Sequence, residues 1–318
     1  MATNAAGTNE ALDASLNTII TEFRLLSDED AVCKSNATKF TLAPHSGRSK
    51  VMLNYGRFTA YDLQDGVDMA QAQNLSDTQT AFTPNEVGCQ TIIPDTTLRR
   101  IADTDLLQRV GKIMRNAYNL KEDADGCAQF SSWTPTMGGT TTVIGVGHLA
   151  AARARIRIGN STANPEPFTQ GTIVGILHPY VTHVLSQRMI PLADVPSGTN
   201  VYTPATASTA ATIGPAAHDG ISADILRRGP SALGLVGNVK VFEDANISVS
   251  TTPSVVNAVF STDGFIYTSE FEPQLRPQER DESLRGIELN VIGSYVWGLY
   301  RSGASGVALT TDCTAPTS

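Results

Sequence analysis

The residues of this 318-residue chain that could do chemistry begin with a glycine-rich turn. In the stretch TTTVIGVGHLAAARARIRIG, Gly145, Gly147 and Ala150 match the G-x-G-x-x-A pattern that holds a dinucleotide pyrophosphate at a helix N-terminus. The acidic residue expected about 20 positions later would be Glu166, but the prolines of ANPEPF are incompatible with a central strand. The pattern therefore indicates a loop-to-helix junction, and a nicotinamide-dependent enzyme remains only a distant alternative.

Histidines and acidic pairs offer weaker signals. His178 and His183, in HPYVTH, do not share a helix face as residues four apart would, so we expect a strand-end histidine and a helix-surface histidine. The G-x-S-x-G pattern of esterases does not occur. Two acidic pairs are better explained as solvated or interface charges than as glycosidase carboxylates: Asp123/Asp125 and Glu270/Glu272. We expect no catalytic residue, no cofactor and no metal site.

The four cysteines are widely separated, and no two of them have the spacing of a metal-binding pair. They are Cys33, Cys89, Cys127 and Cys313. We expect free thiols that are buried as small hydrophobic side chains. A disulfide formed after release into an oxidising medium stays open as the alternative.

Composition narrows the function classes. The chain has 23 basic and 31 acidic residues, a net charge of −8, which argues against high-affinity nucleic-acid binding. The start of the chain, MATNAAGTNEALDAS, lacks the basic and apolar regions of a signal peptide. Apolar runs fall short of the roughly 18 residues of a membrane span. We therefore expect a protein that is made in a cytoplasm and does not enter a membrane.

A long polar hairpin is the first element that stands out. Apolar residues alternate in SKVMLNYGRFTAYDL with one slip at Gly56, which predicts a strand with a bulge: Val51, Leu53, Tyr55, then Phe58 and Ala60. Asp65-Gly66 is a turn signal, and the chain is expected to return as VGCQTII, at 87–93. A two-stranded ribbon has too little apolar surface to be stable alone, so it needs a surface to lie on.

An unusually long amphipathic helix follows, with Asp103 or Thr104 as N-cap. Its expected apolar face consists of Leu106, Val110, Ile113, Met114, Ala117, Leu120, Ala124 and Ala128. If the helix runs to Phe130 it is about 40 Å long. Acidic residues at 122, 123 and 125 oppose the helix dipole, so the helix either ends near Leu120 or meets cations from elsewhere.

The bounds of the remaining elements are predicted less precisely. An amphipathic stretch within 12–23 is a docked helix or an arm that reaches a neighbour. Helices are expected over 148–158 and from Pro179, with a buried strand at 171–177 and a loop over 197–220. Four further strands are expected in NVKVFED, VVNAVF, GFIYTSEF and IELNVIGSYVWGLYR. Between the last two, RPQERDESLR alternates charges of both signs.

The order of these segments resembles the major capsid proteins of tailed bacteriophages. YGRFTAYDLQDGVD followed by LSDTQTAFTPNEVG resembles the extended loop (E-loop) of that family, and DLLQRVGKIMRNAYNLKEDAD resembles its spine helix. Three later stretches agree: GILHPYVTHVL, GPSALGLVGNVKVFEDANI and GIELNVIGSYVWGLYRSGASGVALTTD. The similarity covers roughly residues 40–312.

The resemblance implies a mixed α+β fold of the HK97 type. Its parts would be an N-terminal arm (1–40), the E-loop (41–96), a peripheral P-domain (97–138 and 263–288) and an axial A-domain (139–262 and 289–318). The implied function is self-assembly into the icosahedral shell that encloses the double-stranded DNA of a tailed phage. The shell of a cellular nanocompartment with the same fold is the near alternative.

The implied partners are other copies of the chain, in hexamers and pentamers, together with a portal; whether a decoration protein also binds the shell stays open. Because the E-loop begins within fifty residues of Met1, a separate scaffolding protein is also implied. The DNA would be enclosed without sequence-specific binding, and the protein would be found in the virion after assembly in the bacterial cytoplasm. Candidate contacts between subunits are Tyr55, Arg57, Phe58, Asp65, Asp68, Arg276, Glu279, Arg280, Asp281, Glu282 and Arg285.

Overall fold

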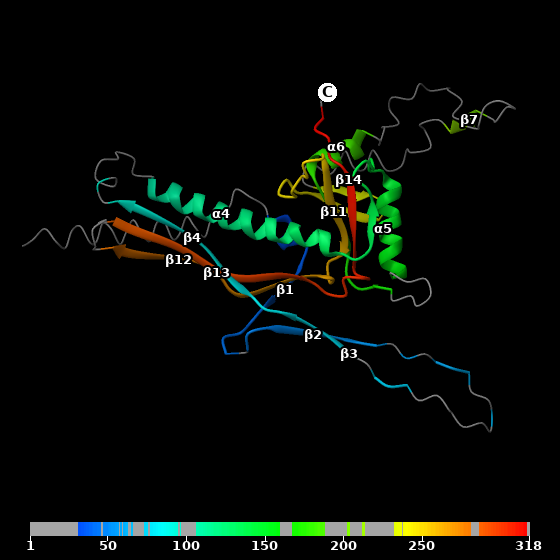
Figure 1. Ribbon diagram of the computed structural model, residues 1–318, viewed down its shortest axis with the longest axis horizontal. Coiled ribbons are helices and arrows are strands. Elements are labelled where there is room, and N and C mark those ends of the chain that lie inside the picture. Colours follow the sequence, from blue (N-terminus) through cyan, green and yellow to red (C-terminus); the bar gives the residue numbers. More distant parts are fainter. Residues whose placement is uncertain are drawn as a thin grey trace, which may run out of the picture.

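A computed structural model shows a long helix lying along an extended sheet, with a second sheet and two helices at the C-terminal end of that helix (Figure 1). The fold is mixed α+β, as predicted. The structure describes residues 31–45, 47–56, 58, 60–62, 65, 73–75, 77–94, 96, 106–159, 167–187, 202–203, 212–213, 232–236, 238–280 and 286–316. The amphipathic stretch near the N-terminus and both N-cap candidates lie outside these residues.

The first sheet has four strands in the order β1-β12-β13-β4. Their bounds are Thr38–Thr41 for β1, Asn85–Pro94 for β4, Phe265–Arg280 for β12 and Gly286–Leu299 for β13. β1 runs parallel to β12, and the other neighbours are antiparallel. The last two expected strands are thus confirmed, and β12 continues through the alternating charges as far as Arg280.

The long helix α4 spans Leu106–Ala128 and continues into a short 3-10 helix, η1 (Gln129–Ser132). The longer of the two predicted lengths is therefore correct. The predicted apolar face is wrong in part, because Ile113, Ala117, Leu120 and Ala128 are exposed. The buried face instead consists of Gly111, Met114, Tyr118, Asn119, Glu122, Asp123, Gly126 and Cys127. A four-residue helix, α2 (Val32–Ser35), packs against it.

The second sheet has six strands in the order β5-β14-β11-β6-β10-β9. Their bounds are Thr136–Gly138 for β5, Ile173–Leu177 for β6, Ala232–Val236 for β9, Val239–Glu243 for β10, Ser254–Ser261 for β11 and Gly306–Asp312 for β14. β6 is buried along its whole length, as predicted. Two helices accompany this sheet: α5 (Val146–Ile158) and α6 (Pro179–Gln187), both close to their expected bounds.

One hydrophobic core joins the two sheets. Its aromatic centre comes from η1, β11, β12 and β13. Phe260 and Phe265 lie with ring centroids 4.9 Å apart, and Phe265 stacks on Trp297 at 4.8 Å. Aromatic pairs of this kind add about 0.5–1.5 kcal/mol each beyond the burial of their area.

A separate two-stranded ribbon extends away from this body (Figure 1). It consists of β2 (Lys50–Tyr55) and β3 (Asp77–Phe82), which are antiparallel. The predicted return strand, VGCQTII, is wrong as a ribbon strand: it lies in β4, which pairs with β13. The predicted bulge is also wrong, because β2 ends at Tyr55.

Two short strands, β7 (Tyr202–Thr203) and β8 (Thr212–Ile213), pair within the stretch expected to be a loop. None of the helices in the described part of the chain combines the length and the hydropathy that a membrane span requires.

Candidate functional site

The ribbon carries an uncovered apolar face. Val51, Leu53 and Tyr55 point to the same side of β2, and their exposed fractions are 45%, 42% and 57%. Their partners across the ribbon are also exposed: Ala81, Gln79 and Asp77. Three more large apolar residues are exposed in the segment that joins the two strands: Phe58, Tyr61 and Leu75. An exposed row of large apolar side chains of this kind indicates an interaction surface.

The base of the ribbon is fixed to the body. Phe82, at the end of β3, is buried, and its ring lies against Gly298 of β13, where no Cβ atom occupies the space. The hydroxyl of Tyr300 donates a hydrogen bond of 3.1 Å to the backbone carbonyl of Leu53. The ribbon is thus held at one end, while its apolar face remains exposed.

A second apolar surface lies on α4. Ile113, Ala117 and Leu120 follow each other at spacings of four and three residues, so they form one stripe. All three are exposed, Ile113 by 66% and Leu120 by 44%. They were predicted to be core residues, but the sheet covers the opposite face of the helix. The α4 stripe is therefore a second candidate contact surface.

The described part of the predicted charge run, Arg276 to Arg280, lies at the end of β12, where Arg280 pairs with Gly286. Arg276 is exposed, and its Nη2 is 3.5 Å from Oε1 of Gln274. Glu279 lies in β12 beside Arg280. Asp281, Glu282 and Arg285 lie outside the described residues.

The predicted contact residues do not form a single site. Tyr55, Phe58 and Asp65 are exposed on or near the ribbon. Arg57 and Asp68 lie outside the described residues. The ribbon and the β12–β13 tip point toward opposite ends of the molecule (Figure 1). The candidate contacts therefore fall on two separate surfaces.

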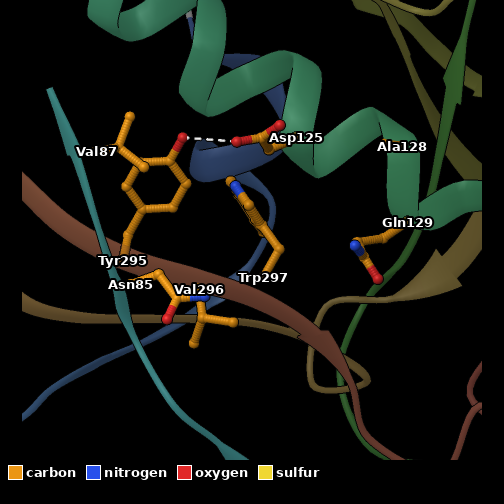
Figure 2. Close-up of a pocket in the computed structure, with 8 residues that line it drawn as sticks. All are labelled: Asn85, Val87, Asp125, Ala128, Gln129, Tyr295, Val296 and Trp297. Atoms are coloured by element: carbon orange, nitrogen blue, oxygen red, sulfur yellow. Dashed lines mark hydrogen bonds between the residues drawn. The ribbon is translucent and has the colours of Figure 1, made fainter. Parts of the chain in front are cut away.

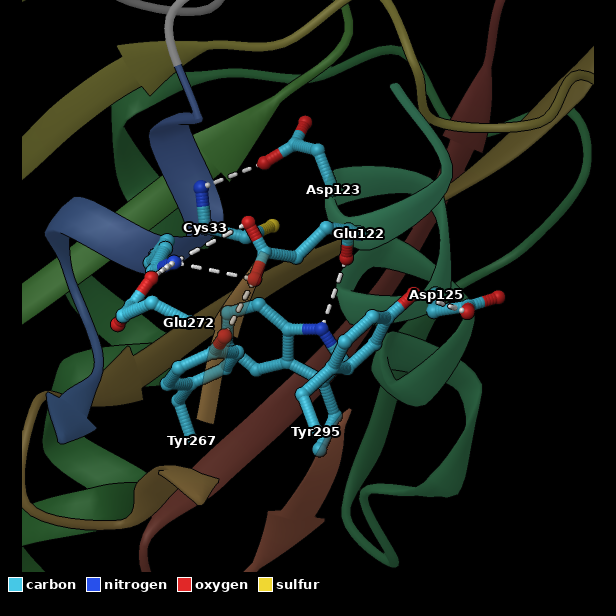
Figure 3. A network of polar contacts seen from close by, with 9 residues as sticks. Cys33, Glu122, Asp123, Asp125, Tyr267, Glu272 and Tyr295 are labelled. Atoms are coloured by element: carbon cyan, nitrogen blue, oxygen red, sulfur yellow. Dashed lines mark hydrogen bonds and ion pairs between the residues drawn. The ribbon is translucent and has the colours of Figure 1, made fainter. Parts of the chain in front are cut away.

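A buried polar network explains how α4 continues past its acidic residues (Figure 3). Nζ of Lys34, on α2, lies 3.1 Å from Oε1 of Glu122 and 3.5 Å from Oε2 of Glu272. The hydroxyl of Tyr267 donates to Glu122, and the indole of Trp297 donates to the Glu122 carbonyl at 2.8 Å. The prediction that cations from another part of the chain let the helix continue past Leu120 is therefore confirmed, and Lys34 is such a cation.

A second polar group lies beside this network. The structure brings together Cys33, Asp123, Cys127 and Asp244, all buried, with potential ligand atoms within 4.8 Å of one another. Burial and the neighbouring Asp244 carboxyl raise the pKa of Asp123 to about 7. Sequence reasoning missed this group, because Cys33 and Cys127 are 94 positions apart. The only local signal was the four-residue spacing of Asp123 and Cys127 on one helix face.

A shallow pocket of about 240 Å³ lies between the end of α4 and the β4–β13 pair (Figure 2). Its lining includes Asp125, Tyr295 and Trp297, and the hydroxyl of Tyr295 donates to Oδ2 of Asp125 at 2.8 Å. Ligand pockets usually have volumes of about 300–1,000 Å³. With its one carboxylate already hydrogen-bonded to Tyr295, this small pocket does not indicate an active site.

The structure also tests the predictions for the glycine-rich motif and for the two histidines. Gly145 directly precedes α5, and its backbone N–H donates to Nδ1 of His148 at 3.2 Å. The strand before it, β5, ends at Gly138 and, among the described strands, pairs only with β14. The strand-to-helix unit of a dinucleotide site is thus missing here, and the predicted loop-to-helix junction is confirmed. His178 follows β6 and His183 lies on α6, both as predicted.

Comparison with solved structures identifies the fold. A chain from the head of Helicobacter pylori bacteriophage KHP40 matches with a TM-score of 0.63 and 13% sequence identity, over 88% of this chain and 88% of that chain. A chain from the capsid of Ralstonia phage GP4 matches with a TM-score of 0.60 and 11% identity, over 89% and 88%.

A virus-like particle from Pyrococcus furiosus gives a weaker match, with a TM-score of 0.52 and 11% identity, over 94% of this chain and 99% of that chain. Scans against protein-family models and curated proteins found no match. The chain therefore has the HK97-type capsid fold over about nine tenths of its length, as predicted.

Proposed function

From this fold we propose that the protein is the major capsid protein of a tailed double-stranded DNA phage. Copies of the chain self-assemble into the icosahedral shell that encloses the genome. The protein is a structural component of the virion and not an enzyme, and assembly takes place in the cytoplasm of the host bacterium. The similarity to phage head and capsid chains supports this proposal, because it extends over nearly the full length of both partners.

The observation that carries the proposal is the exposed face of the ribbon. Val51, Leu53 and Tyr55 keep about half of their surface in water in the isolated chain. Burial of apolar surface contributes about 25 cal/mol per Å². A ribbon that is held only at its base and carries such a face is expected to bury it on a neighbouring subunit.

The α4 stripe is the matching candidate for the receiving surface. Ile113 and Leu120 present apolar area on a rigid helix, and sheets and helices both need such faces covered. In this arrangement each subunit donates its ribbon to one neighbour and receives the ribbon of another. Such a head-to-tail contact generates a closed ring when repeated rotation from copy to copy returns to the first copy. The hexamers and pentamers implied by the resemblance to capsid proteins are closed rings of this kind.

The division into parts belongs to the same proposal: arm 1–40, E-loop 41–96, P-domain 97–138 and 263–288, and A-domain 139–262 and 289–318. Hydrogen bonding between β4 and β13 supports a P-domain that also takes in the end of the E-loop range (85–94) and the part of β13 beyond residue 288. Of the contact candidates, the ribbon group is Tyr55, Arg57, Phe58, Asp65 and Asp68. The tip group is Arg276, Glu279, Arg280, Asp281, Glu282 and Arg285.

The remaining proposed partners are a separate scaffolding protein and a portal; a decoration protein on the shell stays an open alternative. The enclosed DNA is held without sequence-specific contacts. The net charge of −8 supports this last point, because a protein that grips DNA tightly concentrates positive charge instead.

A second candidate is the shell of a cellular nanocompartment, supported by the match to the Pyrococcus furiosus virus-like particle. The contents of purified particles separate the two. Particles that contain phage-length DNA support the capsid protein, and particles that contain a cargo protein and no DNA support the nanocompartment.

Electron microscopy of the expressed protein, with and without a scaffolding protein, tests the proposal. The wild-type chain should form closed shells or ring-shaped capsomers. The triple variant Val51→Thr, Leu53→Thr, Tyr55→Thr keeps strand-forming residues but removes the apolar face, and it should fold and fail to assemble. Val249→Thr is the matched control, since Val249 is 44% exposed outside the ribbon. A triple variant that assembles like the control would refute the role of the ribbon.

A further inference from the structure

We propose that Cys33, Asp123, Cys127 and Asp244 form a binding site for a tetrahedral divalent metal ion, with Zn²⁺ the best chemical match. The site lies where three distant parts of the chain meet: Cys33 on α2, Asp123 and Cys127 on α4, and Asp244 just after β10. It is separate from the ribbon and from the α4 stripe.

The distances fit a tetrahedral ion. Sγ of Cys33 lies 3.4 Å from Sγ of Cys127, and the two sulfurs lie 3.8 Å and 3.3 Å from Oδ2 of Asp244. A tetrahedral Zn²⁺ with Zn–S bonds of about 2.3 Å places two sulfurs about 3.8 Å apart, and a sulfur and an oxygen slightly closer. Small side-chain shifts would therefore bring the donors onto one ion.

The donor set selects the kind of metal. Two thiolates and two carboxylates favour Zn²⁺ over Ca²⁺ and Mg²⁺, which prefer oxygen ligands alone. All four side chains are at most 6% exposed, so an ion here would be enclosed by protein ligands, as in structural zinc sites. The thiols would release their protons to solvent on binding.

Neighbouring N–H groups orient both carboxylates. Oδ1 of Asp123 accepts from the backbone N–H of Cys33 at 3.0 Å, and its Oδ2 accepts from Nδ2 of Asn246 at 2.9 Å. Oδ1 of Asp244 accepts from the backbone N–H of Asn246 at 2.8 Å, which turns Oδ2 toward the two sulfurs. Outer contacts of this kind fix the ligands of metal sites.

The negative charge of the cluster also favours the binding of a cation. Two buried carboxyls lie together, and among the described ion pairs no lysine or arginine reaches either of them, since Lys34 contacts Glu122 and Glu272 instead. Asp123 and Cys127 lie in the last turns of α4, where the helix carries negative partial charge. A bound Zn²⁺ would supply the missing positive charge and link the three segments.

Metal binding by the full chain, purified under reducing conditions and freed of metal with a chelator, tests the site. After Zn²⁺ is added back and the excess is removed, we expect about one Zn²⁺ per chain by elemental analysis. Co²⁺ in place of Zn²⁺ should give the thiolate-to-metal absorption and the intense visible bands of a tetrahedral Co²⁺ site. Zn²⁺ should also raise the unfolding temperature.

Variants assign the ligands. Cys33→Ser and Cys127→Ser should each weaken the thiolate absorption and the double variant should abolish it, while Cys89→Ser, whose sulfur lies outside the cluster, should retain it. Asn246→Ala removes only an orienting donor, so it should fold and weaken metal affinity by about 10- to 100-fold. The proposal is overturned if folded wild-type protein takes up no stoichiometric metal. Absorption that survives loss of both Cys33 and Cys127, or a Cys33–Cys127 disulfide in freshly isolated protein, would equally overturn it.

Discussion

The ring of Phe82 lies directly against the Cα atom of Gly298, and a Cβ atom at that position would overlap the ring. This contact joins the ribbon to β13 at the point where β3 ends and the sheet begins. The orientation of the ribbon therefore depends on a glycine that is distant in the sequence.

Gly298→Ala tests this contact. The added methyl group must displace the Phe82 ring, and overpacking of this kind costs about 1–3 kcal/mol. We expect a lower free energy of unfolding and weaker shells, measured by urea denaturation and by sedimentation. Gly147→Ala is the matched control, because the space around Gly147 in α5 is open. Equal behaviour of the two alanine variants would show that the Phe82 contact does not position the ribbon.

The α4 stripe gives a second prediction. Ile113→Gln with Leu120→Gln replaces exposed apolar side chains by a good helix former, so the unfolding free energy of the subunit should change by less than about 0.5 kcal/mol. Shell formation, followed by light scattering, should shift to higher protein concentration. Lys121→Gln, on the same helix, is the control and should assemble normally. Unchanged assembly of the double variant would remove the stripe from the interface.

The Lys34–Glu122 ion pair gives a prediction for the subunit alone. Only 16% of the Lys34 side chain and 2% of the Glu122 side chain are exposed. Lys34→Met leaves a buried carboxylate without its cation, which costs about 3–5 kcal/mol in buried pairs. Lys121→Met breaks the exposed pair with Asp125 and should cost about 0.2–1 kcal/mol. Similar urea midpoints for the two variants would contradict the role assigned to Lys34.

The tip of the β12–β13 hairpin gives a salt-dependent prediction. If Arg276 contacts a neighbouring subunit, Arg276→Glu together with Arg280→Glu should leave folding intact and lower the melting temperature of shells. The loss should be larger at low salt, where charge repulsion is less screened. A melting temperature that does not change at any salt concentration would identify the run as a solvated face.

Much of the fold could be predicted because it follows hydrophobic pattern and helix length. The buried strand β6 and the start of α6 at Pro179 have strong local signals. The return strand β3 could not be predicted, because Asp77, Thr78 and Gln79 are polar and face solvent. An exposed ribbon places no apolar requirement on its second strand.

The prediction of the buried face of α4 was partly wrong for a related reason. Glu122 and Asp123 are polar, yet they are buried because Lys34, Cys33 and Asn246 supply partners. Helical periodicity cannot reveal partners that come from distant parts of the chain. For the same reason, the proximity of Cys33 to Cys127 could not be predicted.

Cryo-electron microscopy of purified particles tests the central claim most directly. Assembly through the ribbon predicts closed shells in which the face formed by Val51, Leu53 and Tyr55 is covered by another copy of the chain in every subunit. A 33.7 kDa monomer that forms no rings or shells at micromolar concentration, with or without a scaffolding protein, would contradict it.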